Sequence, residues 1–302
     1  MTLLDSPALA QARGTGTTPV RLIRAEIMKV RSTNTWWLFL LGIVVFTALA
    51  LWSNGVSHHY ELYPQLNTMS GAGKAQALAG AARARTHAGL AKIASNMMTS
   101  GQFVGVLFAM VIGILVITNE FAHRTAAVTF LITPHRAVVV MAKLAAAACF
   151  GALFWLASTI INLGVTPIYL HSQRVSVSLT SWIVIRSVSL NLVAFVIWAV
   201  FGLGLGAVIR SQIGSVLAGL AIYLVGFAAV ELIFHLIYNV YRHAWVLGAP
   251  VIAPAVASLV MITPGRAFAH APPQWAGLVV LAGYALVFAV IGTAVTCRRD
   301  VA

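Results

Sequence analysis

The chain has 302 residues, of which 60% are hydrophobic and only 8% are charged. A soluble domain carries about 25% charged residues, so a water-facing surface cannot be built from this composition. It predicts an integral membrane protein and excludes a soluble enzyme, a secreted disulfide scaffold and a disordered protein. The formal net charge is +13. Because the basic residues mostly flank apolar runs, they indicate contacts with membrane lipids and orientation signals, and no nucleic-acid partner is expected.

Six apolar runs approach the length of about 20 residues that a helix needs to cross a bilayer. In chain order they lie at 36–52, 102–118, 138–163, 183–208, 213–233 and 275–296. Open β-structure is excluded because its strand edges cannot satisfy their backbone groups in lipid. The alternating segments of about ten residues that mark a β-barrel are absent. The predicted fold class is therefore all-α integral membrane, with six transmembrane helices.

The chain ends and the short loops carry the signals for orientation. Residues 1–19 lack the apolar region of a signal peptide and are predicted to form a flexible cytoplasmic tail before a single transmembrane domain over 20–302. Basic residues are denser in four pieces than in the remaining loops: 1–35, 119–143, 209–212 and 297–302. The positive-inside rule then predicts a multi-pass protein of the cytoplasmic membrane with both termini in the cytoplasm.

Three segments outside the spans have patterns of their own. Residues 20–35 combine an apolar stripe with a basic surface, which predicts an amphipathic helix on the inner leaflet. The alternative is a plain basic flank of the first span. The Ala-rich stretch 75–96 predicts a helix in the first outer loop. Residues 236–274 alternate short apolar pieces with prolines, which predicts re-entrant or interfacial helices between spans five and six.

The stretch between spans two and three is the most informative. Glu120 lies at the inner end of a span, a short amphipathic piece and a turn at Pro134 follow, and Lys143 opens the next span. A short helix parallel to the membrane here could transmit motion to a cytosolic partner. The alternative is a solvated inner loop. Glu120 is expected to hold this segment by capping or by pairing with a basic residue, and Arg136 and Lys143 to anchor it to headgroups or to the partner.

This stretch resembles the matching segment of the ABC-2 type permeases, the membrane subunits of a class of ABC exporters. The residues that carry the resemblance are Glu120, Phe121, Thr125, Pro134, Arg136, Ala142 and Lys143. Glu26 and Lys29, followed by Trp36 and Trp37, resemble the start of the family's sequences, and the glycines at 202, 204 and 206 before Arg210 resemble the end of its fourth span. Arg124 departs from the pattern, because the family often has Gly at that place.

The resemblance implies a dimer of permease subunits, two copies of one chain or a pair of paralogues, each bound to a separate cytosolic ATP-binding subunit. It makes 119–136 the coupling helix and 20–31 a second contact region. The residues that it places at this interface are Glu26, Lys29, Glu120, Phe121, Arg124, Thr125, Pro134, Arg136 and Lys143. No G-x-x-x-x-G-K-[ST] phosphate loop occurs in the sequence. ATP and Mg are therefore expected in the partner subunit, while this chain is expected to be no enzyme and to hold no cofactor.

Several polar or small residues inside the spans are further candidates. Gly202 and Gly206 form a G-x-x-x-G pattern, which favours close helix packing. Asn162 and Asn191 are expected to bond a neighbouring helix. Glu231 is the acid expected within a span, with His235 one helical turn later. The pair could form a proton or cation relay, or Glu231 could lie at the outer interface and pair with Arg242 or Arg266.

These observations rank the possible functions. The first is the permease subunit of an ATP-driven exporter that moves a hydrophobic or amphipathic substrate, such as a drug, a lipid or a lipid-linked molecule, by alternating access. The second is an ion-coupled secondary carrier, which needs ionisable groups near mid-membrane, where the sequence offers Glu231 alone. The third is a non-transporting membrane anchor or sensor subunit. No metal site is predicted, since the adjacent His58 and His59 lack diagnostic spacing.

Overall fold

The computed structural model describes residues 19–33, 35–122, 136–268 and 270–298, and in this part of the chain every regular element is a helix. Six helical segments are long and apolar enough to cross a membrane. They are α3 (Trp36–Leu62), the pair α5 (His87–Met98) and α6 (Gln102–Ala122), α8 (Arg136–Ser172), α9 (Trp182–Ile209), the run from α10 (Gln212–Leu220) through η2 (Ala221–Val225) to α11 (Gly226–Tyr241), and α13 (Gln274–Arg298). The predicted all-α fold with six candidate spans is confirmed.

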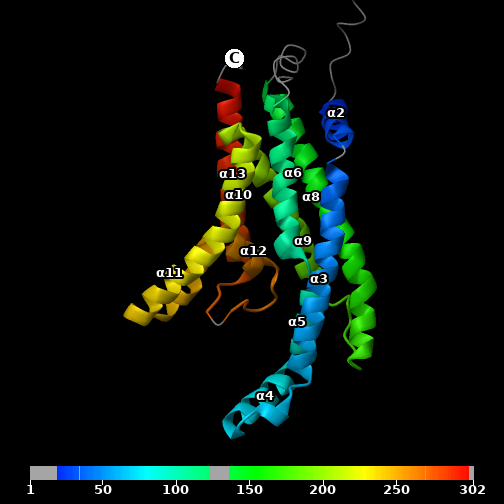
Figure 1. The fold of residues 1–302 in the computed structure, drawn as a ribbon, viewed down its shortest axis with the longest axis vertical. Helices are drawn as coiled ribbons and strands as arrows, with labels where there is room; N and C mark the ends of the chain where they lie inside the picture. The colour runs from blue at the N-terminus through cyan, green and yellow to red at the C-terminus, as the bar shows by residue number, and fades with distance from the viewer. Residues whose placement is uncertain (1–18, 34, 123–135, 269, 299–302) are drawn as a thin grey trace, which may run out of the picture.

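The helices form an elongated bundle (Figure 1). The helix α2 (Pro19–Ser32) and the last turns of α13 lie at one end, here called the α2 end, and α4 (Gly71–Ala84) lies at the other, the α4 end. The centre of the bundle is built from α6, α9 and part of α8, whereas α3, α11 and α13 are peripheral. Large apolar side chains on these peripheral helices are exposed, as expected of helix faces that contact lipid.

Glycines allow the two central helices to touch through their backbones. A Cβ added at Gly202 of α9 would lie 2.0 Å from the carbonyl oxygen of Met110, and one at Gly113 of α6 would lie 2.0 Å from that of Ala199. A Cβ at Gly206 would meet the side chain of Ile117 at 2.8 Å. The pair Gly202 and Gly206 thus packs α9 against α6 within the chain, the close approach that small residues permit.

The second span is broken between α5 and α6. Gly101 takes a positive φ of 82° there, and a Cβ at this position would lie 2.6 Å from Oγ1 of Thr47. Asn162 of α8 is fully buried, and its Nδ2 donates hydrogen bonds to the carbonyl oxygens of Met98 (3.0 Å) and Ser100 (3.1 Å). Carbonyls freed by a helix break inside a span require such partners, so Asn162 stabilises the break.

The Ala-rich stretch was expected to form one outer helix, and this prediction is wrong in detail. It is divided between α4 and α5, because Oγ1 of Thr86 accepts a hydrogen bond from the amide of Gly89 and caps the start of a new helix. The second of these helices extends the span that was expected to begin at residue 102. The short η1 (Leu66–Thr68) joins α3 to the α4 end.

The proline-rich segment before α13 forms two short helices, η3 (Ala244–Ile252) and α12 (Pro254–Ile262). They meet at an angle of 107°, the geometry of a broken span or of a re-entrant loop. Pro254 starts α12 because a proline in the first turn removes no helical hydrogen bond. The predicted end of the preceding span at residue 233 is wrong, since α11 continues to Tyr241.

We expect Gly202→Ala to lower the free energy of unfolding by about 1–3 kcal/mol, the usual cost of overpacking, because its Cβ would overlap the Met110 carbonyl. Gly164→Ala on α8 is the matched control, since no described atom of a neighbouring element lies within 4 Å of a Cβ at that position. Thermal unfolding of both purified variants in one detergent measures the difference. Equal midpoints would contradict backbone contact between α6 and α9.

Candidate functional site

The helix α2 presents a carboxylate on its buried face. It begins at Pro19, a residue favoured in the first helical turn. Lys29 and Arg31 lie in its last turn, where cations favour the helix dipole. Glu26 and Val30, one helical turn apart, are both buried against the bundle. The predicted amphipathic segment is thus a helix, and its inner face is not wholly apolar.

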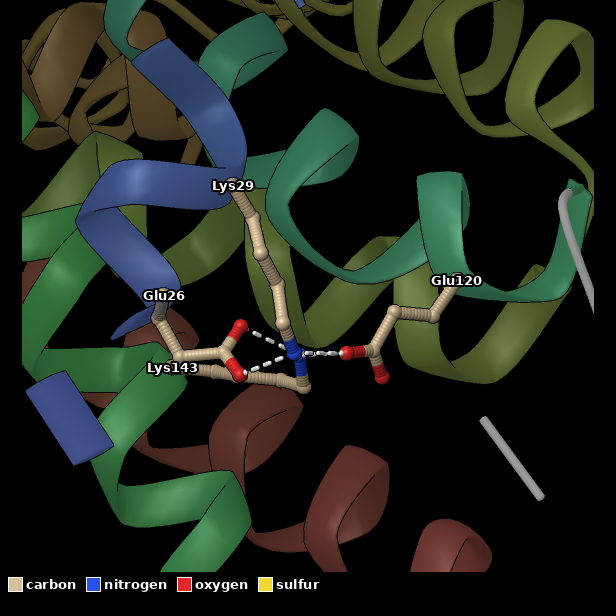
Figure 2. A network of polar contacts seen from close by, with 4 residues as sticks. All are labelled: Glu26, Lys29, Glu120 and Lys143. Carbon is tan, nitrogen blue, oxygen red and sulfur yellow. Dashed lines mark hydrogen bonds and ion pairs between the residues drawn. The ribbon is translucent and has the colours of Figure 1, made fainter. Parts of the chain in front are cut away.

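Four side chains from three helices meet at this face (Figure 2). Nζ of Lys143, from α8, lies 2.6 Å from Oε2 of Glu26 and 2.8 Å from Oε1 of Glu120, at the end of α6. Nζ of Lys29 lies 2.6 Å from Oε1 of Glu26 and 2.7 Å from Oε1 of Glu120. Each carboxylate contacts both ammonium groups. We call these four residues the charge cluster.

Because the charge cluster is buried, its positive and negative charges must be equal in number. Lys143 is 2% exposed, Glu26 5% and Glu120 6%, whereas the side chain of Lys29 is 45% exposed. Isolated charges in such surroundings are strongly unfavourable unless they are paired and hydrogen-bonded. Two acids and two bases leave no net charge, so the closed arrangement of opposite charges is the condition for burying any one of them.

Lys29 is the member of the charge cluster that reaches the surface. Partial burial lowers its pKa, but the hydrogen bonds and attraction of Glu120 and Glu26 raise it more, so the pKa lies above lysine's ordinary value. A raised lysine pKa contributes stability that is complete below the ordinary value and is lost as the pH rises through the raised one. The contact between Lys29 and its carboxylates therefore persists across the neutral range.

The charge cluster joins α2 to the ends of two spans. Glu120 precedes, and Lys143 follows, the stretch 123–135 that separates α6 from α8 in sequence. A displacement of α2 away from either span would separate a buried carboxylate from its counter-charge. The arrangement therefore couples the positions of α2, α6 and α8. Its groups are acids and ammonium ions already paired with each other, so it offers neither a nucleophile nor a set of free ligands.

Glu120 pairs with two basic residues that the sequence did not name, whereas the segment that it was expected to hold lies, from residue 123 to 135, outside the described residues. Lys143 was expected to anchor to headgroups or to a partner, and this is wrong, because its ammonium group is bound inside the chain. Glu26 is likewise buried. Of the four, Lys29 alone keeps a half-exposed side chain for contact with another molecule.

The remaining residues of the expected interface have less structural detail. Phe121 lies in the last turn of α6 and Arg136 begins α8, but their side chains are not among those described. Arg124, Thr125 and Pro134 lie outside the described residues. The role expected of all five stays a prediction.

The polar residues predicted within spans lie apart from the charge cluster. Asn162 bonds a neighbouring helix as expected. Asn191 is fully buried on α9, and among the described residues neither its Oδ1 nor its Nδ2 has a hydrogen-bond partner. Glu231 and His235 lie on the exposed face of α11 and line a cavity of about 200 Å³ together with His270. Glu231 and Arg242 form no ion pair in the described part of the chain.

Sequence reasoning also missed a polar cavity beside the α5–α6 break. Asn54, Lys92 and Asn96 line it, together with the break itself. The helical spacing of Lys92 and Asn96, four residues apart, was an available signal.

Within the described residues, no group of three or more His, Cys, Asp or Glu side chains could hold a metal ion.

Comparison with known proteins gives no match to a family model and none to a curated protein. What the fold supports is a class: an all-helical, multi-pass membrane protein with six candidate spans. The function is therefore argued from the charge cluster and the spans around it.

We expect Lys143→Met to lower the free energy of unfolding by about 3–5 kcal/mol, the usual cost of leaving a buried charge unpaired. Glu26 and Glu120 would then share Lys29 alone. Adding Glu120→Gln should recover much of the loss, because the cluster is neutral again. Unfolding in mixed micelles with increasing sodium dodecyl sulfate measures both variants.

Two comparisons sharpen this test. Lys29→Met should cost less than Lys143→Met, because water reaches the half-exposed Lys29 site. Lys74→Met, at an exposed lysine on α4, should have little effect. A Lys143→Met protein as stable as the unaltered one would show that the charge cluster does not hold α2 in place.

Proposed function

We propose that this chain is the permease subunit of an ATP-driven exporter, with ATP and Mg bound by a separate cytosolic subunit. The observation that carries the proposal is the charge cluster. Glu26 and Lys29 from α2 are tied to Glu120 and Lys143 at the ends of α6 and α8. A motor on another chain can move the spans only through contacts that resist separation, and a closed set of buried ion pairs is such a contact.

In this proposal α2 is an interfacial helix on the cytoplasmic leaflet, and residues 119–136 form the coupling helix. A displacement of α2 or of residues 119–136 would move α6 and α8 together, because separating α2 from either span would leave a buried charge unpaired. Exposed basic side chains on α2, among them Arg21, Arg24 and Arg31, suit anionic lipids or an acidic partner surface. The dense basic residues near the α2 end favour placing both termini in the cytoplasm.

The proposal extends to the assembly and the transport cycle. A second copy of the chain, or a paralogue, would pack against a peripheral helix face, and lipids would cover the others. Helices α3, α11 and α13 carry exposed apolar side chains that fit either neighbour. The bent pair η3–α12 would enter the bilayer as a re-entrant loop between spans five and six. Movement of α6 and α8 relative to α9 would alternate access to the path.

The ion-coupled carrier has less support. It requires an ionisable group within the packed centre, where protonation or ion binding could change helix packing. Glu231 lies instead on the exposed face of α11, a helix with no buried residue. A sensor or anchor subunit remains compatible with the fold, and a transport assay separates it from the permease.

The first experiment is purification of the chain from native membranes in mild detergent, with mass spectrometry of bound proteins and an ATPase assay on the same sample. We expect a stoichiometric ATP-binding partner that is lost when residues 119–136 are replaced. A chain that purifies alone and shows no ATPase activity, under conditions that keep other such complexes intact, would overturn the proposal.

We expect Glu120→Ala to reduce the rate of ATP-dependent transport at least tenfold, while the protein stays in the membrane. The double variant Glu120→Ala with Lys143→Met separates coupling from folding, because it removes one charge of each sign and keeps the cluster neutral. It should fold and remain uncoupled. Glu231→Gln is the matched control: the permease should tolerate it, whereas an ion-coupled carrier should not. Normal transport by the double variant would refute the role given to the charge cluster.

A further inference from the structure

A cavity of about 400 Å³ lies beside the α5–α6 break. Its walls come from α3, from α5, from the break at Thr99–Gly101, from the first residues of α6 and from α12. It differs from the larger cavity of about 520 Å³ between α3 and α8, whose lining is almost wholly apolar. The cavity at the break has a polar wall and an apolar wall, and we call it the break cavity.

The polar wall of the break cavity carries hydrogen-bond donors and a positive charge. Lys92 and Asn96 lie one helical turn apart on α5, so both point to one face of that helix. Among the described lining residues, Lys92 has the only charged side chain. Its Nζ donates to the carbonyl of Arg266 at 3.5 Å, which leaves donors for another acceptor. Asn54 faces the same space and donates to Oγ of Ser100 at 2.8 Å.

The start of α6 adds to this polarity. Phe103 and Val104, in its first turn, line the break cavity. Backbone N–H groups at a helix N-terminus favour a negative group, which agrees with the charge of Lys92. No carboxylate lies among the described lining residues to oppose it. The polar wall is therefore suited to an anion.

The remaining lining, here called the apolar wall, is apolar and partly exposed. Phe46 of α3 and Phe103 of α6 are each 41% exposed, and Leu259 of α12 is 38% exposed. Ala50 and Ile262 complete this side. Apolar side chains that remain exposed beside a polar pocket suit the hydrocarbon part of a ligand whose polar part is held next to them. Together the two walls match a molecule with a negative head and an apolar tail.

We propose that the break cavity binds an amphipathic anion, with its negative head at Lys92 and Asn96 and its tail along Phe46, Phe103 and Leu259. As the cargo site of an exporter, this assignment rests on the proposed function. As a binding site, it stands on the lining of the cavity alone. The break between α5 and α6 then has a use, because it opens a polar surface inside an otherwise apolar span.

The test uses the purified full chain in nanodiscs of phosphatidylcholine. The probes are two fluorescent single-chain lipids with the same tail and fluorophore, lysophosphatidylglycerol with a net negative head and lysophosphatidylcholine with a neutral one. We expect Lys92→Gln to weaken binding of the anionic probe about tenfold, the worth of a hydrogen bond to a charged group, and to weaken the other probe less, because its choline already balances its phosphate. Lys74→Gln, at an exposed lysine of α4 outside the cavity, is the matched control.

A second variant tests the place of the tail. Ala50→Trp should fill the apolar side and weaken both probes. A fluorescent fatty acid of the same length distinguishes the sources: binding as tight as that of lysophosphatidylglycerol assigns the site to amphipathic anions in general, and weaker binding assigns it to phospholipids. Equal binding of the anionic probe by the unaltered, Lys92→Gln and Lys74→Gln proteins would overturn the proposal, as would unchanged binding by Ala50→Trp.

The outcome is separable from that of the exporter proposal, because the binding test needs neither ATP nor a partner. If the chain binds the anionic probe through Lys92 but has no ATP-binding partner, the binding site is supported and the exporter function is contradicted. If the chain has such a partner but probe binding does not depend on Lys92, the exporter function is supported and this binding site is contradicted.

Discussion

The structure depends on the rule that charges removed from water must be paired. Lys143, at the start of α8, is nearly inaccessible and is held by Glu26 and Glu120. Neither carboxylate could be buried without an ammonium group, and Lys29 completes the balance. This requirement holds α2 against the bundle, beside the end of α6 and the start of α8, although α2 lies 91 and 117 residues away from its partners Glu120 and Lys143.

The same rule, applied to the backbone, shapes the interior of the second span. The break between α5 and α6 frees carbonyl groups within a span, and Asn162 satisfies two of them. Gly101 permits the turn because it takes a positive φ and leaves room for Thr47. The polar groups gathered around this break form one wall of the break cavity. Both candidate sites thus arise where polar groups interrupt an apolar bundle.

Much of the fold could be predicted, because composition and the length of an apolar run are local properties, and they determine whether a helix is stable in the bilayer. The six candidate spans, the helix predicted over 20–35 and the bonding of Asn162, an amide within an apolar run, to a neighbouring helix follow from such signals. The ends of the spans could not be placed in the same way. Thr86 divides the Ala-rich stretch through a single cap, a short-range contact that average hydropathy does not register, and α11 continues to Tyr241 through residues that are still largely apolar.

The sequence by itself determined that the chain is a helical membrane protein, since 8% charged residues cannot cover a soluble surface and lipid admits only structures with internally satisfied backbones. Tertiary structure decided the partners. Glu26 and Lys143 are 117 residues apart, and Lys29 and Glu120 are 91 apart. No local pattern specifies such pairs, because which helix ends meet depends on the packing of α6, α8 and α9. The glycine contacts between α6 and α9 and the walls of the break cavity were decided in the same way.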